Sequence, residues 1–171
     1  MHTNPSELHR DAVRATSPAS SWNKCLCFRL HEVEYGIDLL LVREIRVYEQ
    51  PTWLAGAPPS VVGMLNMRSE IVPIIDLRLR FGLPACFEKH TITVVVTLAD
   101  RTAGLVVDSV SDVLELDSSQ ITTAPPLAGT AETPLVARMG LVRQGERERM
   151  LMLLELEPLL ADIDTVAQLA A

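Results

Sequence analysis

The stretch from Val62 to Leu77 reads Val-Gly-Met-Leu-Asn-Met-Arg-Ser-Glu-Ile-Val-Pro-Ile-Ile-Asp-Leu. Two apolar runs, over 61–65 and 71–75, flank a short polar segment, which is the pattern of a β-hairpin. The expected tip carries Asn66 and Arg68 between apolar strands. An arginine that a rigid scaffold holds in a turn is a candidate contact residue, although a solvated turn charge is the alternative.

Outward from this hairpin, the chain has the pattern of many short strands. Leu26, Phe28 and Leu30 alternate with other residues, which is strand spacing. Glu157-Pro158 opens a C-terminal helix, because proline suits the first helical turn. We therefore expect a mainly β fold, a barrel or a sandwich, with a helix at its end. The expected extended segments are 26–30, 35–39, 45–48, 61–65, 71–75, 92–98, 103–107, 110–116, 135–142 and 150–156, with short helical turns at 40–44 and 76–81 and loops at 51–60 and 125–133.

Composition indicates one globular domain. The chain has 171 residues, which is enough to bury a core. The net charge of −7 without a cluster of Lys and Arg argues against binding nucleic acid. Neither a secretion signal nor an apolar run near the roughly 18 residues that cross a bilayer is visible, so a cytoplasmic protein is expected. Residues 1–21 are expected to form a flexible tail before a single domain over 22–171.

Three cysteines, Cys25, Cys27 and Cys86, are expected to be reduced thiols. Cys25 and Cys27 fall on one face of the first strand. A metal site would need two more ligands. Cys86 and His31 are the candidates, but their positions in the sequence do not match a known metal-ligand spacing. We therefore expect no metal and no other cofactor, and small half-buried side chains instead.

Catalytic motifs are missing from the sequence. There is no phosphate-binding loop, dinucleotide-binding glycine motif or nucleophile elbow. The carboxylates Asp108, Asp112, Glu115 and Asp117 have no base partner nearby in the sequence, so we expect them to be solvated or to cap hairpins. An enzyme is not expected.

Four segments in order resemble the CheW family, the chemotaxis coupling proteins. The opening stretch is similar to the family's Gly-Val-x-Asn-Leu-Arg-Gly-x-Ile-x-Pro-x-x-Asp-Leu-Arg signature. Residues 34–45, Glu-Tyr-Gly-Ile-Asp-Leu-Leu-Leu-Val-Arg-Glu-Ile, and 104–114, Gly-Leu-Val-Val-Asp-Ser-Val-Ser-Asp-Val-Leu, match two further motifs. Pro125-Pro126 stands where the family places prolines. The resemblance covers residues 23–160.

The resemblance implies two intertwined five-stranded β-barrels of SH3-like shape with a short C-terminal helix. It also implies an adaptor that links the cytoplasmic tips of methyl-accepting chemoreceptors to the histidine kinase CheA, in an array that is recruited to the membrane without inserting into it. One alternative is the scaffold of a non-flagellar chemosensory system that controls pili or a second messenger. A small-molecule-binding barrel or an unrecognised enzyme is another.

The receptor-contact positions carry over from the family motifs. Arg68 matches the arginine of the Asn-Leu-Arg-Gly hairpin, in which Asn66 is the asparagine. Leu39, Val42 and Glu44 match positions after the Tyr-Gly-Ile-Asp strand. An apolar groove with a charged rim suits the helical hairpin of a receptor tip, whereas core packing is the alternative for the two apolar residues. The kinase-binding surface matches no motif and is left unassigned.

Ser69 departs from the family pattern, which has glycine at this position. If the turn requires a positive φ, serine costs on the order of 1 kcal/mol relative to glycine. Met67 in place of leucine is a tolerated exchange of similar volume.

Overall fold

The computed structural model describes residues 23–125 and 135–169. The tail expected over 1–21 and all but the first residue of the loop expected over 125–133 lie outside the described residues. The strands are β1 (Lys24–Leu30), β2 (Val33–Asp38), β3 (Val42–Val47), β4 (Val61–Met67), β5 (Glu70–Asp76), β6 (Ile92–Leu98), β7 (Arg101–Val107), β8 (Ser109–Glu115), β9 (Ile121–Thr123), β10 (Val136–Gln144) and β11 (Arg147–Leu154). The helices are α1 (Leu77–Arg80) and α2 (Leu156–Leu169), with single 3-10 turns η1 (Leu39–Leu41) and η2 (Ser118–Gln120).

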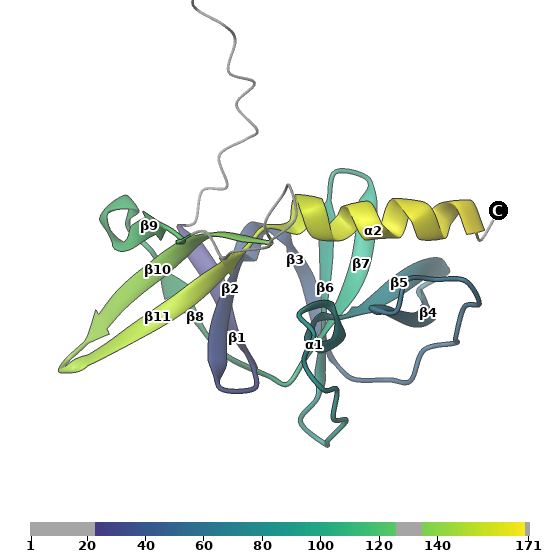
Figure 1. The fold of residues 1–171 in the computed structure, drawn as a ribbon, viewed down its shortest axis with the longest axis horizontal. Helices are drawn as coiled ribbons and strands as arrows, with labels where there is room; N and C mark the ends of the chain where they lie inside the picture. The colour runs from purple at the N-terminus through teal and green to yellow at the C-terminus, as the bar shows by residue number, and fades with distance from the viewer. Residues whose placement is uncertain (1–22, 126–134, 170–171) are drawn as a thin grey trace, which may run out of the picture.

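The strands form two sheets, and the chain passes from the first sheet to the second and back. One sheet has the order β8-β1-β2-β11-β10-β9, and the other has the order β3-β6-β7-β5-β4. The chain begins in the first sheet, builds the whole second sheet with β3 to β7, and then returns to the first (Figure 1). The expected mainly β fold of two intertwined SH3-like subdomains is therefore confirmed. The first sheet differs from the expected five strands by the three-residue strand β9.

Each sheet has an apolar cluster of its own, and a third cluster joins the two sheets. β1 is buried on both faces, because its alternate residues enter different clusters. Leu26 and Phe28 meet Val94 and Leu105 of the second sheet in the shared cluster, whereas Cys25 and Cys27 belong to the cluster of the first sheet. The shared cluster therefore fixes how the two sheets sit against each other.

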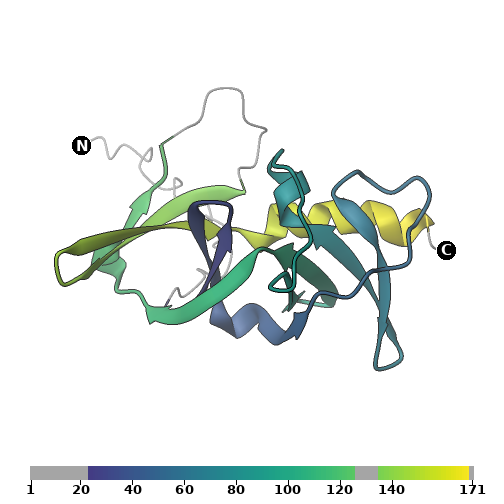
Figure 2. The ribbon, with the colours of Figure 1, turned by 90° about the horizontal axis from the view of Figure 1, so that it is seen from below.

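Helix α2 covers the shared cluster with one apolar face. Leu159, Ile163 and Val166 are buried in that cluster, which confirms the amphipathic helix expected at the C-terminus. The helix begins one residue earlier than expected, at Leu156. An ion pair from Arg80 to Asp162, 2.8 Å long, attaches it to α1. Figure 2 shows the helix running along the second sheet after the chain leaves β11.

A fully buried arginine connects the sheets through polar contacts. The Arg78 guanidinium donates to both oxygens of buried Asp76 and to one oxygen of Asp108, 3.0 Å away. The other Asp108 oxygen accepts from the backbone N–H of His31, in the β1–β2 turn. The hairpin-capping role expected for Asp108 is thus confirmed, and the carboxylate also neutralises part of a buried charge.

One local expectation is wrong. A helical turn was expected over 40–44, but the turn is η1 and strand β3 already begins at Val42. The Asp38 side chain accepts a hydrogen bond from the backbone N–H of Leu40 at 3.0 Å, so this aspartate starts the turn at Leu39, one residue earlier than expected.

Candidate interaction site

The tip of the β4–β5 hairpin is a two-residue turn made of Arg68 and Ser69. Met67 and Glu70 are the last paired residues of the two strands. Both turn residues have positive φ, 51° at Arg68 and 72° at Ser69. Positive φ at both central residues is the signature of a type I′ turn, which matches the twist of the strands. The sequence-based concern about Ser69 is therefore confirmed, since a side chain occupies a conformation that favours glycine.

Arg68 reaches from this turn to Glu44 on β3. Its Nη2 atom lies 3.6 Å from a Glu44 carboxylate oxygen. The Arg68 side chain is 82% exposed and the Glu44 side chain 26% exposed, so the carboxylate is the anchored member of the pair. Arg46 also approaches Glu44, at 3.5 Å. The guanidinium of Arg68 therefore presents donors to solvent while one charge partner orients it.

A second ion pair attaches the same hairpin to β3. Arg43 donates to Glu70 at 2.8 Å. This hydrogen bond holds the pKa of Glu70 below its ordinary value. Glu70 directly follows the turn, so the tip is held on β3 at two neighbouring points. The sequence motifs carried Glu44 as a receptor position but contained no signal for its contact with Arg68, because 24 positions of the numbering separate the two.

Leu39 and Val42 are half-buried and pack against the shared apolar cluster. Core packing, which was the alternative role for both residues, therefore buries part of each side chain, and the rest stays exposed. Leu40, between them in η1, is 81% exposed. Sequence reasoning missed Leu40, since a run of three leucines does not reveal which one faces solvent.

Exposed apolar side chains continue along β3 and the start of β5. Ile45 and Val47 are 47% and 71% exposed, and Ile71 is 68% exposed. Asn66, the remaining predicted contact, is exposed on β4 and is paired with Ile71 in the strand ladder. The arrangement offers what a helical partner needs, which is apolar surface beside oriented charges.

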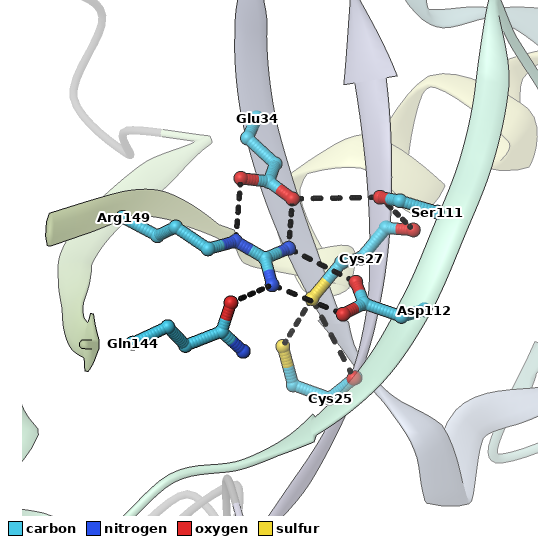
Figure 3. A network of polar contacts seen from close by, with 7 residues as sticks. All are labelled: Cys25, Cys27, Glu34, Ser111, Asp112, Gln144 and Arg149. Atoms are coloured by element: carbon cyan, nitrogen blue, oxygen red, sulfur yellow. Dashed lines mark hydrogen bonds and ion pairs between the residues drawn. The ribbon is translucent and has the colours of Figure 1, made fainter. Parts of the chain in front are cut away.

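A second polar cluster lies in the first sheet, where sequence reasoning had expected Asp112 to be solvated or to cap a hairpin. The guanidinium of Arg149 on β11 pairs with Glu34 on β2 and with Asp112 on β8 (Figure 3). The hydrogen bonds from Arg149 hold the pKa of Asp112 below its ordinary value. The expectation for Asp112 is therefore wrong, because its partner comes from a strand that is distant in the sequence.

The pattern of the CheW-like domain family matches residues 24–164. The chain belongs to the CheW family. This confirms the resemblance that the four motifs indicated, and it identifies the chain with a family of chemotaxis scaffold or coupling proteins. Among the described residues, no helix is long and apolar enough to cross a membrane.

Relatives in the CheW family are similar over most of their length. A chemotaxis protein CheW of Klebsiella aerogenes is 42% identical over 149 residues, which cover 84% of this chain and 87% of that protein. A chemotaxis protein CheW of Rhizobium meliloti is 34% identical over 134 residues, which cover 77% and 83% of the two chains. The crystal structure of the scaffolding protein TtCheW from Thermoanaerobacter tengcongensis superposes with a TM-score of 0.68 at 29% identity, covering 78% of this chain and 88% of that one.

Proposed function

We propose that this chain is a non-enzymatic chemotaxis adaptor that couples the cytoplasmic tips of chemoreceptors to the histidine kinase CheA. Membership in the CheW family supports the adaptor role. The observation that carries the receptor assignment is the position of Arg68, held by Glu44 at 3.6 Å in an exposed turn. The adaptor acts in the cytoplasm and joins membrane-associated arrays through its partners.

The chemistry of the hairpin tip suits the end of a helical bundle. A guanidinium donates several directed hydrogen bonds, which match carboxylates or the free carbonyl groups at a helix end. The ion pair with Glu44 reduces the freedom of the Arg68 side chain before a partner arrives, which lowers the entropic cost of binding. Binding energy is then expected to concentrate on Arg68 and a few neighbours.

The apolar part of the proposed receptor surface comprises Leu39 and Val42, each partly engaged by the core, together with exposed Leu40. A residue that is half-buried in its own domain is already ordered, so it adds contact area at little entropic cost. Asn66 and Glu44 supply the polar rim. This division of roles corresponds to an apolar centre with a charged edge.

The proposal is tested by measuring receptor binding and kinase binding separately. Purified Arg68→Glu is compared with Arg147→Glu, which reverses an exposed arginine beside the turn of another hairpin, β10–β11. We expect Arg68→Glu to weaken binding to a receptor signalling fragment while CheA binding stays near that of the unaltered chain. Equal loss at both partners would argue against a receptor role, and an equal effect of Arg147→Glu would reduce the result to net charge.

A further inference from the structure

Cys25 and Cys27 form a pair of buried thiols inside the first sheet. Their Sγ atoms lie 4.0 Å apart, and both residues belong to the apolar cluster that contains Leu151 and Leu153. Gly36 on β2 makes room for Cys25, because a Cβ atom at that position would lie 2.5 Å from the Cys25 sulfur. The Cys25 thiol thus occupies a space that a side chain at position 36 would fill.

Two carboxylates approach the same thiol from neighbouring strands. The Cys27 Sγ atom and one oxygen each of Glu34 and Asp112 all lie within 4.8 Å of one another. The Cys27 sulfur therefore lies close both to the Cys25 sulfur and to two carboxylates. Zn²⁺ takes this mixture of sulfur and oxygen ligands in a tetrahedron, in which two sulfurs at about 2.3 Å from the metal lie about 3.8 Å apart.

A cationic side chain already occupies the space between the carboxylates. Figure 3 shows the Arg149 guanidinium between Glu34 and Asp112, with the Cys27 sulfur close by. The side chain of Arg149 is 20% exposed and that of Asp112 is 40% exposed, so this side of the cluster is open to solvent. Rotation of Arg149 outward would uncover the carboxylates and the Cys27 thiol together.

We propose that Cys25, Cys27, Glu34 and Asp112 form a site for one thiophilic divalent cation, with Zn²⁺ as the type, and that this cation competes with Arg149 for the carboxylates. Cys27, Glu34 and Asp112 supply three ligands in nearly their present positions. Cys25 joins as the fourth by rotation of its side chain. Each thiol gives up its proton to solvent on binding, so one cation releases two protons and forms two metal–sulfur bonds.

Binding would remove the side-chain ion pairs that connect one hairpin to two other strands. Arg149 lies on β11, and its side chain forms ion pairs with Glu34 on β2 and Asp112 on β8. Once the cation takes both carboxylates, the end of the β10–β11 hairpin keeps its strand pairing but loses these contacts. The site would therefore couple metal binding to the mobility of the end of the β10–β11 hairpin.

Cd²⁺ serves as the probe, because its thiolate complexes absorb in the ultraviolet. The reduced, metal-free full chain is titrated with Cd²⁺, and released protons are counted in a weak buffer. We expect saturation at one equivalent with two protons released, loss of the thiolate absorption in Cys25→Ala and Cys27→Ala, and no change in Cys86→Ala, which removes the exposed cysteine. An unaltered band in Cys27→Ala, or no band at one equivalent in the unaltered chain, would overturn the site.

The competition with Arg149 has its own test. Removing the guanidinium in Arg149→Gln should tighten Cd²⁺ binding at least tenfold, since no internal cation then opposes the metal. Circular dichroism establishes that the variant is folded. Equal or weaker binding by folded Arg149→Gln would contradict the competition. If that variant does not fold, the comparison of Cys27→Ala with Cys86→Ala still decides the site.

Discussion

Arg68, in the turn that follows edge strand β4, approaches Glu44 on β3 to 3.6 Å, although β4 and β3 lie at opposite edges of the five-stranded sheet. Arg43 on β3 meets Glu70, the first residue of β5 beside that turn, at the same place. The sheet therefore curls until residues at its two edges face each other across a short gap, as an SH3-like barrel requires. The Arg68 side chain is therefore oriented by barrel closure and not by its own hairpin alone.

Replacing Ser69 by glycine is expected to stabilise the chain by up to about 1 kcal/mol. Ser69 has a φ of 72°, where a Cβ atom is strained and glycine is not. The free energy of unfolding from urea melts measures the gain. Ser69→Ala is the control, because it removes the hydroxyl group but keeps the strained Cβ, and it should give no gain. A destabilised Ser69→Gly would show that the serine hydroxyl supports the turn.

Replacing Arg78 by methionine is expected to destabilise the chain by about 3–5 kcal/mol, because it leaves the buried carboxylate of Asp76 without its charge partner. The matched control is Arg80→Met, two residues along the chain. Arg80 makes a partly exposed ion pair with Asp162, so its loss should cost no more than about 1 kcal/mol. Urea melts compare the two variants. Similar small losses in both would mean that the buried network adds little to the junction of the sheets.

The Arg149–Asp112 pair should contribute to the acid sensitivity of the fold. The pKa of Asp112 is lowered in the folded chain by Arg149, so the unfolded state binds the proton more readily. The stabilisation is complete above the unfolded pKa of about 3.9 and is lost as the pH falls through the lower folded value. Melting temperatures from pH 6 down to pH 2 should therefore fall less steeply in Asp112→Asn than in the unaltered chain. If the melting temperatures of both chains fell equally with pH, the Arg149–Asp112 pair would contribute nothing to the acid sensitivity.

Removing residues 1–21 is expected to leave the melting temperature nearly unchanged. This stretch has no periodic apolar pattern that could offset the entropy lost on ordering it. Thermal melts of the shortened and the full chain test this expectation. A drop of many degrees would mean that the segment packs on the domain.

Local patterns in the sequence predicted the local structure well. The β4–β5 hairpin follows from two apolar runs around a short polar segment, and α1 follows from Asp76, whose side chain accepts from the backbone N–H of Arg78. Asp38 caps η1 in a similar way, but the helical turn was expected only from residue 40, because the leucines that follow Asp38 carry no clear period. The number of subdomains came from the family resemblance, since strand spacing alone does not determine how strands divide between sheets.

Contacts between distant strands were not predictable in the same way. Arg149 and Glu34 are 115 positions apart and Arg149 and Asp112 are 37 apart, so no local pattern joins them. The same holds for Cys27, whose carboxylate neighbours come from β2 and β8 while the sequence offered only His31 and Cys86 as candidates. Such clusters depend on strand order and register, which the folded chain alone reveals.

We propose that Arg68 is a binding determinant for the receptor and not a stability determinant. The direct measurement is the affinity of Arg68→Glu for a receptor signalling fragment, with CheA affinity and the urea melt recorded on the same preparation. We predict a loss of receptor affinity greater than the tenfold that corresponds to about 1.4 kcal/mol, because the guanidinium donors are removed and a negative charge is placed at the proposed contact. Kinase affinity should stay unchanged, and stability should change by no more than about half a kcal/mol. Unchanged receptor affinity in a folded variant would contradict the account.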